Sequence, residues 1–127
     1  MTRILWIGLA GALGTITRYL VGLWAGRALG TAFPYGTLFV NLAGCFLIAG
    51  ITHVALSTTL ISPTMRLTLT TGFMGGLTTY SSFNLETTQL LQKGNWATAS
   101  MNFGATLVGC FAAGLLGLAV ARRLFGP

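Results

Sequence analysis

Most of the side chains that could bind an ion gather in one apolar stretch, residues 70–86. The stretch reads Thr-Thr-Gly-Phe-Met-Gly-Gly-Leu-Thr-Thr-Tyr-Ser-Ser-Phe-Asn-Leu-Glu and ends on Glu86, the only acidic residue of the chain. Glycine pairs and β-branched threonines weaken a helix, and irregular backbone at membrane depth persists only where protein or a wet cavity covers it. We therefore predict a membrane protein whose third helix breaks near Gly75–Thr79 to build an ion site.

The residues at and after this break suit two kinds of ion. Backbone carbonyls that leave a helix can coordinate a small cation, and the N-terminus of the next half-helix carries a positive partial charge. Tyr80 and Phe83 are three residues apart and share one helix face. Their electropositive ring edges suit a partly dehydrated anion, and Ser81 and Ser82 add hydroxyl donors. The same spacing equally allows two packing rings and hydrogen bonds within the protein.

Other chemistry has little support in the sequence. Gly72, Gly75 and Gly76 look like a phosphate cradle, but no Lys-Ser or Lys-Thr follows them. The chain has neither paired carboxylates nor a nucleophile supported by histidine, so we do not expect an enzyme. Glu86 comes late in its segment, where it either forms a hydrogen bond near the interface or relays protons or cations.

The composition is typical of a membrane protein. Of the 127 residues, 54% are hydrophobic and 6% are charged, whereas about a quarter of the residues of a soluble domain are charged. The basic residues behind the net charge of +6 are too few and too scattered for nucleic acid, and most occupy positions typical of anchors in the lipid interface. Cys45 and Cys110 are expected to be small packing residues, and His53 an idle interfacial residue.

Four segments are each long enough for the about 20 residues that a bilayer requires. They cover approximately residues 4–24, 35–56, 67–92 and 96–121. The first begins like a signal peptide but has no clear cleavage site, so we expect it to be retained as a helix. We predict an all-α integral membrane protein with one four-helix transmembrane domain, residues 1–127.

Two polar residues lie inside the first two spans. Arg18 either extends its charge to the lipid headgroups or faces the protein interior. Asn41 needs a partner in hydrocarbon. It either forms a hydrogen bond to another helix or donates its amide N–H to an anion.

Small residues recur in the first and fourth spans at spacings that place them on one helix face. Such faces allow two helices to approach closely in a membrane, where lipid gives no other reason for them. The residues concerned are Gly8, Gly11 and Gly14 in the first span, and Ala105, Gly109, Ala113, Gly117 and Ala121 in the fourth.

The topology is only weakly biased by charge. Four spans leave both termini on one side, with Arg3, Arg66, Arg122 and Arg123 there and Arg27 and Lys93 on the other. Four helices of this length do not easily enclose a pore, so we expect an oligomer. If both orientations insert, two copies can pair antiparallel, as the inverted repeats of many transporters do within one chain.

Two motifs together resemble a known family. Residues 34–41 read Pro-Tyr-Gly-Thr-Leu-Phe-Val-Asn, and residues 71–86 contain the core Gly-Gly-Leu-Thr-Thr-Tyr-Ser-Ser-Phe. This combination is similar to the Fluc (CrcB-type) fluoride channels, and the likeness extends over nearly the whole chain. The resemblance implies an antiparallel, dual-topology homodimer in the bacterial inner (plasma) membrane. It also implies two fluoride pathways at the dimer interface, and a structural sodium ion on the two-fold axis.

The resemblance also assigns roles to individual residues. It implies that Gly75 and Thr78 give backbone carbonyls to the sodium ion and that Arg18 lies at an aqueous vestibule. The residues implied for the anion pathway are the amide of Asn41, the rings of Tyr80 and Phe83, and the polar track of Ser81, Ser82 and Cys110. Two of them depart from the family pattern. Tyr80 stands where Phe is usual, and Cys110, a weaker hydrogen bonder, stands where Ser is common.

The resemblance thus implies a passive channel that exports toxic fluoride. A dual-topology small multidrug-type exporter is the alternative, since that family has a similar length and number of spans. The exporter family depends on a carboxylate in the first span, whereas Glu86 of this chain lies in the third. A membrane scaffold without transport is a second alternative, which would need neither the break nor the aromatic pair.

Overall fold

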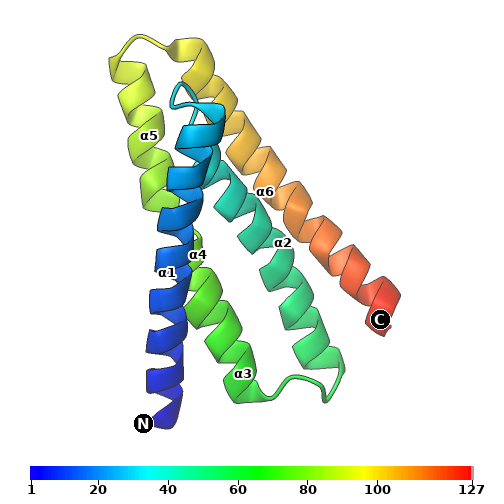
Figure 1. Cartoon of the computed structure of the whole chain (residues 1–127). Helices are drawn as coiled ribbons and strands as arrows, with labels where there is room; N and C mark the ends of the chain where they lie inside the picture. Colours follow the sequence, from blue (N-terminus) through cyan, green and yellow to red (C-terminus); the bar gives the residue numbers. More distant parts are fainter. Residues whose placement is uncertain (127) are drawn as a thin grey trace.

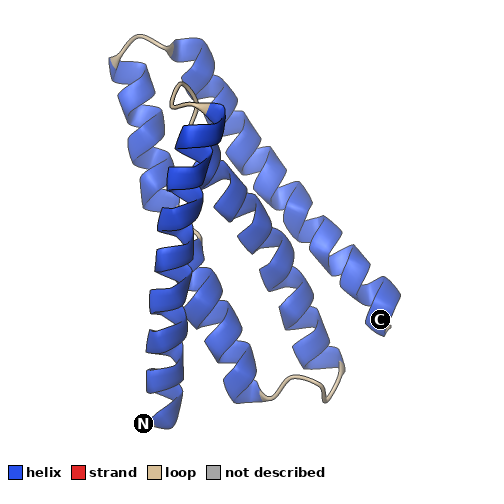
Figure 2. Ribbon diagram, in the orientation of Figure 1, coloured by secondary structure: helices blue, strands red, loops and turns tan. Residues whose placement is uncertain are grey.

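The structure is a computed structural model that describes residues 1–126, and every regular element in that range is a helix (Figure 2). Three helices are long: α1 (Thr2–Leu29), α2 (Tyr35–Ser57) and α6 (Trp96–Phe125). Four shorter elements lie between α2 and α6, namely α3 (Pro63–Leu67), η1 (Thr68–Met74), α4 (Gly75–Leu77) and α5 (Tyr80–Gln92). Pro127, the last residue of the predicted domain, lies outside the described residues.

The helices α1, α2 and α6 are each long and apolar enough to cross a membrane. They correspond to the first, second and fourth predicted spans, although α1 and α6 continue past the predicted ends to Leu29 and Phe125. The predicted span 67–92 is divided among shorter elements and is not one long helix. The all-α prediction is confirmed, and the chain is a multi-pass membrane protein.

The chain leaves helical geometry between α4 and α5. Thr78 has φ −83° and ψ 155°, and Thr79 has φ −155° and ψ 117°, so both are extended. Gly75–Leu77 is helical, which means that only the last two residues of the range 75–79 lie outside a helix. The preceding element η1 is a π-helix, a rare form that is often found at functional sites.

Local sequence explains where the shorter elements begin and end. Ser62 caps α3 because its hydroxyl accepts a hydrogen bond from the Met65 amide at 3.2 Å, and Pro63 occupies the first turn, where no N–H is needed. Gly94 has φ 77°, a conformation that glycine adopts without strain, and it closes the turn after α5. As a result α5 and α6 run antiparallel, as the short loop 93–95 predicts (Figure 1).

Glycines form the closest helix contacts. A Cβ atom on Gly14 of α1 would collide with the Phe73 carbonyl of η1, and one on Gly117 of α6 would collide with the backbone of Phe46 in α2. Figure 1 shows the result, with α1 beside η1 and α4, and with α2 beside α6. The small-residue faces predicted for the first and fourth spans therefore take part in helix packing. Gly8 is an exception, because nothing lies within 4 Å of its Cβ position.

The core of the single chain is small and its exterior is apolar. The buried cluster consists of Val40, Met74 and Leu77. Large side chains such as Trp6 and Phe111 are instead exposed, by 52% and 71% respectively. An apolar exterior of this extent is typical of a surface that contacts lipid or another subunit.

The contact at Gly117 yields a stability test. We expect Gly117→Ala to lower the thermal midpoint of the purified protein in detergent, because the added methyl group must displace the α2 backbone, at a cost of about 1–3 kcal/mol. Gly104→Ala, on the same helix, is the control, since nothing lies within 4 Å of that position. Equal midpoints for the two variants would contradict the close contact between α2 and α6.

Candidate functional site

Asn41 of α2 holds the chain at the point where it leaves the helix. Its Nδ2 donates to the Thr79 carbonyl at 3.0 Å, and its Oδ1 accepts from the Thr79 amide at 2.7 Å. Both residues are buried, each with 7% of its surface exposed. Buried backbone groups need partners, and here one side chain satisfies both groups of Thr79. A carboxamide has two N–H donors, so one donor of Asn41 remains for a further acceptor.

Two backbone carbonyls beside the break lose the amide donors that a continuous helix would give them. In a continuous helix the Gly75 carbonyl would accept from the Thr79 amide, but that amide donates to Asn41. The Thr78 carbonyl would accept from the Ser82 amide, which donates instead to Thr79 Oγ1 at 3.1 Å. Hard cations prefer oxygen ligands, backbone carbonyls among them. The carbonyls of Gly75 and Thr78 therefore suit the predicted sodium ion.

Hydroxyl groups cluster at the N-terminus of α5. Thr79 is the N-cap residue, and its Oγ1 lies 3.2 Å from Ser81 Oγ and 3.1 Å from Ser82 Oγ. The first amides of a helix and its dipole favour negative charge at this end. The cluster therefore combines rotatable O–H donors with a positive electrostatic potential, the requirements of an anion site.

The two predicted aromatic residues touch but differ in burial. The ring centroids of Tyr80 and Phe83 are 5.4 Å apart, with 60° between the ring planes. Phe83 is 2% exposed and also contacts Phe103 of α6, at 6.1 Å, whereas Tyr80 is 71% exposed. Phe83 thus belongs to the interior of the chain, and Tyr80 points out of it.

A cavity of about 260 Å³ lies beside the break and joins several of these groups. Its lining includes four of the predicted site residues, Asn41, Thr78, Tyr80 and Cys110. Because these residues come from α2, the break, α5 and α6, residues far apart in sequence meet in one place. The structure therefore brings these four residues to one cavity, and the roles of all the predicted site residues stay predictions.

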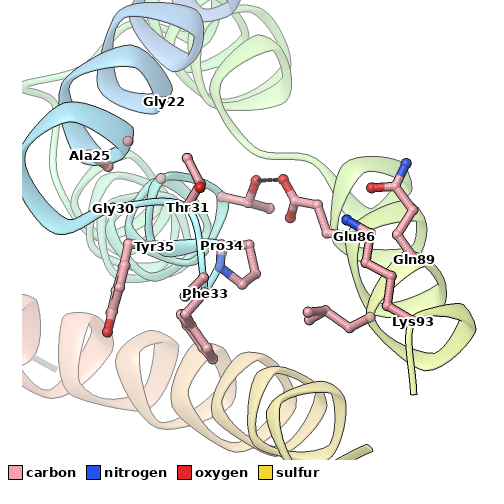
Figure 3. Close-up of a pocket in the computed structure, with 15 residues that line it drawn as sticks. Gly22, Ala25, Gly30, Thr31, Phe33, Pro34, Tyr35, Glu86, Gln89 and Lys93 are labelled. Carbon is pink, nitrogen blue, oxygen red and sulfur yellow. Dashed lines mark hydrogen bonds between the residues drawn. The ribbon is translucent and has the colours of Figure 1, made fainter. Parts of the chain in front are cut away.

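A second cavity, also of about 260 Å³, contains Glu86 (Figure 3). Thr37 Oγ1 donates to Glu86 Oε1 at 2.6 Å, the dashed line in Figure 3. The other oxygen, Oε2, is buried without a hydrogen-bond partner among the described residues. Of the two interpretations left open for Glu86, the hydrogen bond is present. The relay stays a prediction.

Arg18 does not join either cavity. Its side chain is half-buried. Arg18 lies near the middle of α1, because this helix continues to Leu29 instead of ending near Trp24. Neither of the two cavity linings includes it. Its vestibule role therefore stays a prediction that rests on the resemblance.

Comparison with known proteins identifies the family. Residues 5–118 match the family described as CrcB-like protein, Camphor Resistance (CrcB). The chain belongs to this family. A protein of Sorangium cellulosum named fluoride-specific ion channel FluC is 53% identical over 124 residues, which cover 98% of each chain. Proteins of the same name from Anaeromyxobacter dehalogenans and Geobacter metallireducens are both 48% identical, over 99% and 98% of this chain and the full length of each relative.

Membership of the CrcB family confirms the resemblance drawn from the two motifs. Two residues of the candidate site were not predicted from the sequence. Thr79 accepts one hydrogen bond from Asn41 and donates another to it, and a threonine just before a helical run is a recognisable N-cap signal. Thr37 pairs with Glu86, and its position one helical turn before Asn41 places both side chains on one face of α2.

The Asn41 bonds yield a second test. We expect Asn41→Leu to speed hydrogen–deuterium exchange of the Thr79 amide, because leucine leaves both Thr79 backbone groups unpaired, at about 1–3 kcal/mol each. Asn102→Leu is the matched control. It removes another buried amide, which donates to Thr87 Oγ1 at 2.9 Å and has no bond to the break. Equal exchange at Thr79 in both variants would refute the role of Asn41.

Proposed function

We propose that this protein is a passive, fluoride-selective channel that exports fluoride across the bacterial inner membrane and so relieves fluoride toxicity. The observation that carries the proposal is the 53% identity, over 98% of both chains, to a relative named fluoride-specific ion channel FluC. The site agrees with that name, because the cavity beside the break offers hydrogen-bond donors and an aromatic ring to an ion. The function is transport and not catalysis.

The proposed anion pathway passes from the Asn41 amide to the start of α5. Fluoride is small and strongly hydrated, so a pathway must replace lost water with donors of similar strength. The unused N–H of Asn41 and the hydroxyls of Ser81 and Ser82 supply such donors. The edges of Tyr80 and Phe83 add a weaker attraction that suits an anion, and the thiol of Cys110 lies on the same cavity.

The functional unit is an antiparallel homodimer with dual topology, in which the segment 67–92 acts as a broken third span. Tyr80, an aromatic residue of the pathway, is 71% exposed on one chain, so a second chain has to complete the wall around the anion. The apolar exterior of α1 and α6 supports contact with lipid and a second copy. Two-sided labelling tests this arrangement, since a single fixed orientation would contradict it.

A structural sodium ion on the two-fold axis would join the two chains. The carbonyls of Gly75 and Thr78 would hold the ion from one chain, together with the same pair from an inverted copy. The bound cation would also place a positive charge beside both anion pathways. The chain's own part is to hold these carbonyls out of the helix through Asn41 and Thr79.

The alternative, a small multidrug-type exporter, is not favoured. A coupled exporter of organic cations needs a titratable carboxylate at its substrate site. Glu86 is the only acidic residue, and its Oε1 accepts a hydrogen bond from Thr37 away from the cavity at the break. The neighbours of that cavity are neutral donors, which suit an anion better than a cation.

Fluoride efflux from liposomes that contain the purified protein tests the function. We expect rapid fluoride loss and no comparable chloride loss. Phe83→Ile and Asn41→Asp should abolish the flux, because the first removes the ring and the second puts a negative charge in the anion pathway. Phe125→Ile, at the far end of α6, is the matched control and should keep the flux.

Two results would overturn the proposal. Equal fluoride and chloride rates, or no fluoride flux from a dimeric and folded protein, would remove the fluoride channel. Near-normal rates in Phe83→Ile or Asn41→Asp would remove those residues from the pathway while leaving the function intact. Size-exclusion chromatography of each variant separates a lost pathway from a lost dimer.

A further inference from the structure

Two thiols meet between α2 and α6. Cys45 lies on α2 and Cys110 on α6, both are half-buried, and neither forms a disulfide. The turns of helix that carry them pack together, because a Cβ atom on Gly109, next to Cys110, would lie 3.0 Å from the side chain of Leu42, three residues before Cys45. The sequence favoured separate packing roles for these residues, so their proximity is a product of the fold.

The contact follows from the packing of the two helices. Gly114, one helical turn after Cys110, lies so close to α2 that a Cβ atom there would be 3.7 Å from the Cys45 carbonyl. Both thiols also line the cavity of about 260 Å³ beside the break, together with Asn41 and Tyr80. The pair is therefore open to a small ligand on the side of the proposed anion pathway.

Two neighbouring thiols are a ligand set for a particular class of metal ion. Thiolate sulfur is soft and selects soft ions such as Cu⁺, and two sulfur ligands are enough for the linear coordination that Cu⁺, Ag⁺ and Hg²⁺ accept. Zinc sites need more ligands, and no cluster of three or more His, Cys, Asp or Glu residues occurs in the described part of the chain. The pair thus suits a soft, two-coordinate ion.

We propose that Cys45 and Cys110 form a two-thiolate site for a soft metal ion, and that the bound ion closes the fluoride pathway. The closing step rests on the proposed function, whereas the binding step does not. With mercuric chloride as the probe, both S–H bonds and both Hg–Cl bonds break and two Hg–S bonds form. Two protons and two chloride ions leave, and no atom changes oxidation state.

The bound metal would block the pathway because of where it lies. The metal lies in the cavity that Asn41 and Tyr80 line, so it occupies volume through which the anion passes. It also ties α2 to α6 at the level of the break. An inhibitor of this kind depends on both cysteines.

The stoichiometry of binding tests the site without any transport measurement. Purified protein in detergent is titrated with mercuric chloride, and the remaining thiols are counted with a chromogenic disulfide reagent. We expect one mercury ion per chain to remove both thiols. Two mercury ions per chain, or thiols that still react after one equivalent, would show separate sites and overturn the proposal.

The strength of binding gives a second readout. Removing mercury from a bridge of two thiolates should take about 100-fold more of a competing small thiol than removing it from a single thiolate. The reason is that the second Hg–S bond forms within one molecule. Cys45→Ser and Cys45→Ala each leave one thiol. Two variants are used so that a folding defect in one of them does not decide the result. Equal resistance in wild type and both variants would overturn the bridge.

Fluoride efflux tests the closing step. We expect mercuric chloride to stop efflux through the wild type, and the Cys45 variants to need about 100-fold more mercury for the same fractional loss, each measured against its own mercury-free rate. Full efflux from protein that holds one mercury ion per chain would refute the closing step. If the wild type carries no fluoride before mercury is added, the proposed function fails, and the titration still decides the binding site.

Discussion

The pair of hydrogen bonds between Asn41 and Thr79 is the constraint on which the rest of the site depends. A helix in a membrane satisfies its own backbone, and an interruption persists only where something else binds the released groups. Asn41 binds the amide and the carbonyl of Thr79 in a buried position. Without this side chain, the amide and the carbonyl of Thr79 would have no partner, and the Thr79 amide would return to the Gly75 carbonyl. The Thr78 carbonyl depends in turn on Thr79, whose hydroxyl accepts the hydrogen bond of the Ser82 amide.

Close helix packing brings Asn41 to the break. Gly44, one turn after Asn41 on α2, leaves space that the Thr78 side chain fills, since a Cβ atom there would overlap the Thr78 methyl group. On the opposite side, Gly14 allows α1 to lie against the Phe73 backbone. Glycine therefore has a packing role at these positions, and the same contacts fix where Asn41 lies relative to the break.

The sequence predicts the helical class, three of the spans and the residues that gather at the break, because hydropathy and the type of residue carry that information. It does not predict which hydrogen bonds form. Phe83 and Tyr80 look equivalent by spacing, yet one is 2% and the other 71% exposed. Phe83 also contacts Phe103 on α6, and a contact between residues so far apart in sequence has no local signal. The contact of Thr37 with Glu86, and the cavity that Cys45 and Cys110 share, are of the same kind.

The central claim is that Asn41 and the Thr79 hydroxyl together turn the carbonyls of Gly75 and Thr78 from helix bonding to ion binding. Solid-state NMR of carbonyl ¹³C labels at these two residues tests it most directly, in protein prepared with sodium or with N-methylglucamine as the only cation. The account predicts that both carbonyl shifts move between the two preparations, and that the Gly114 shift does not. Identical Gly75 and Thr78 shifts in both preparations, at values typical of a continuous helix, would contradict it.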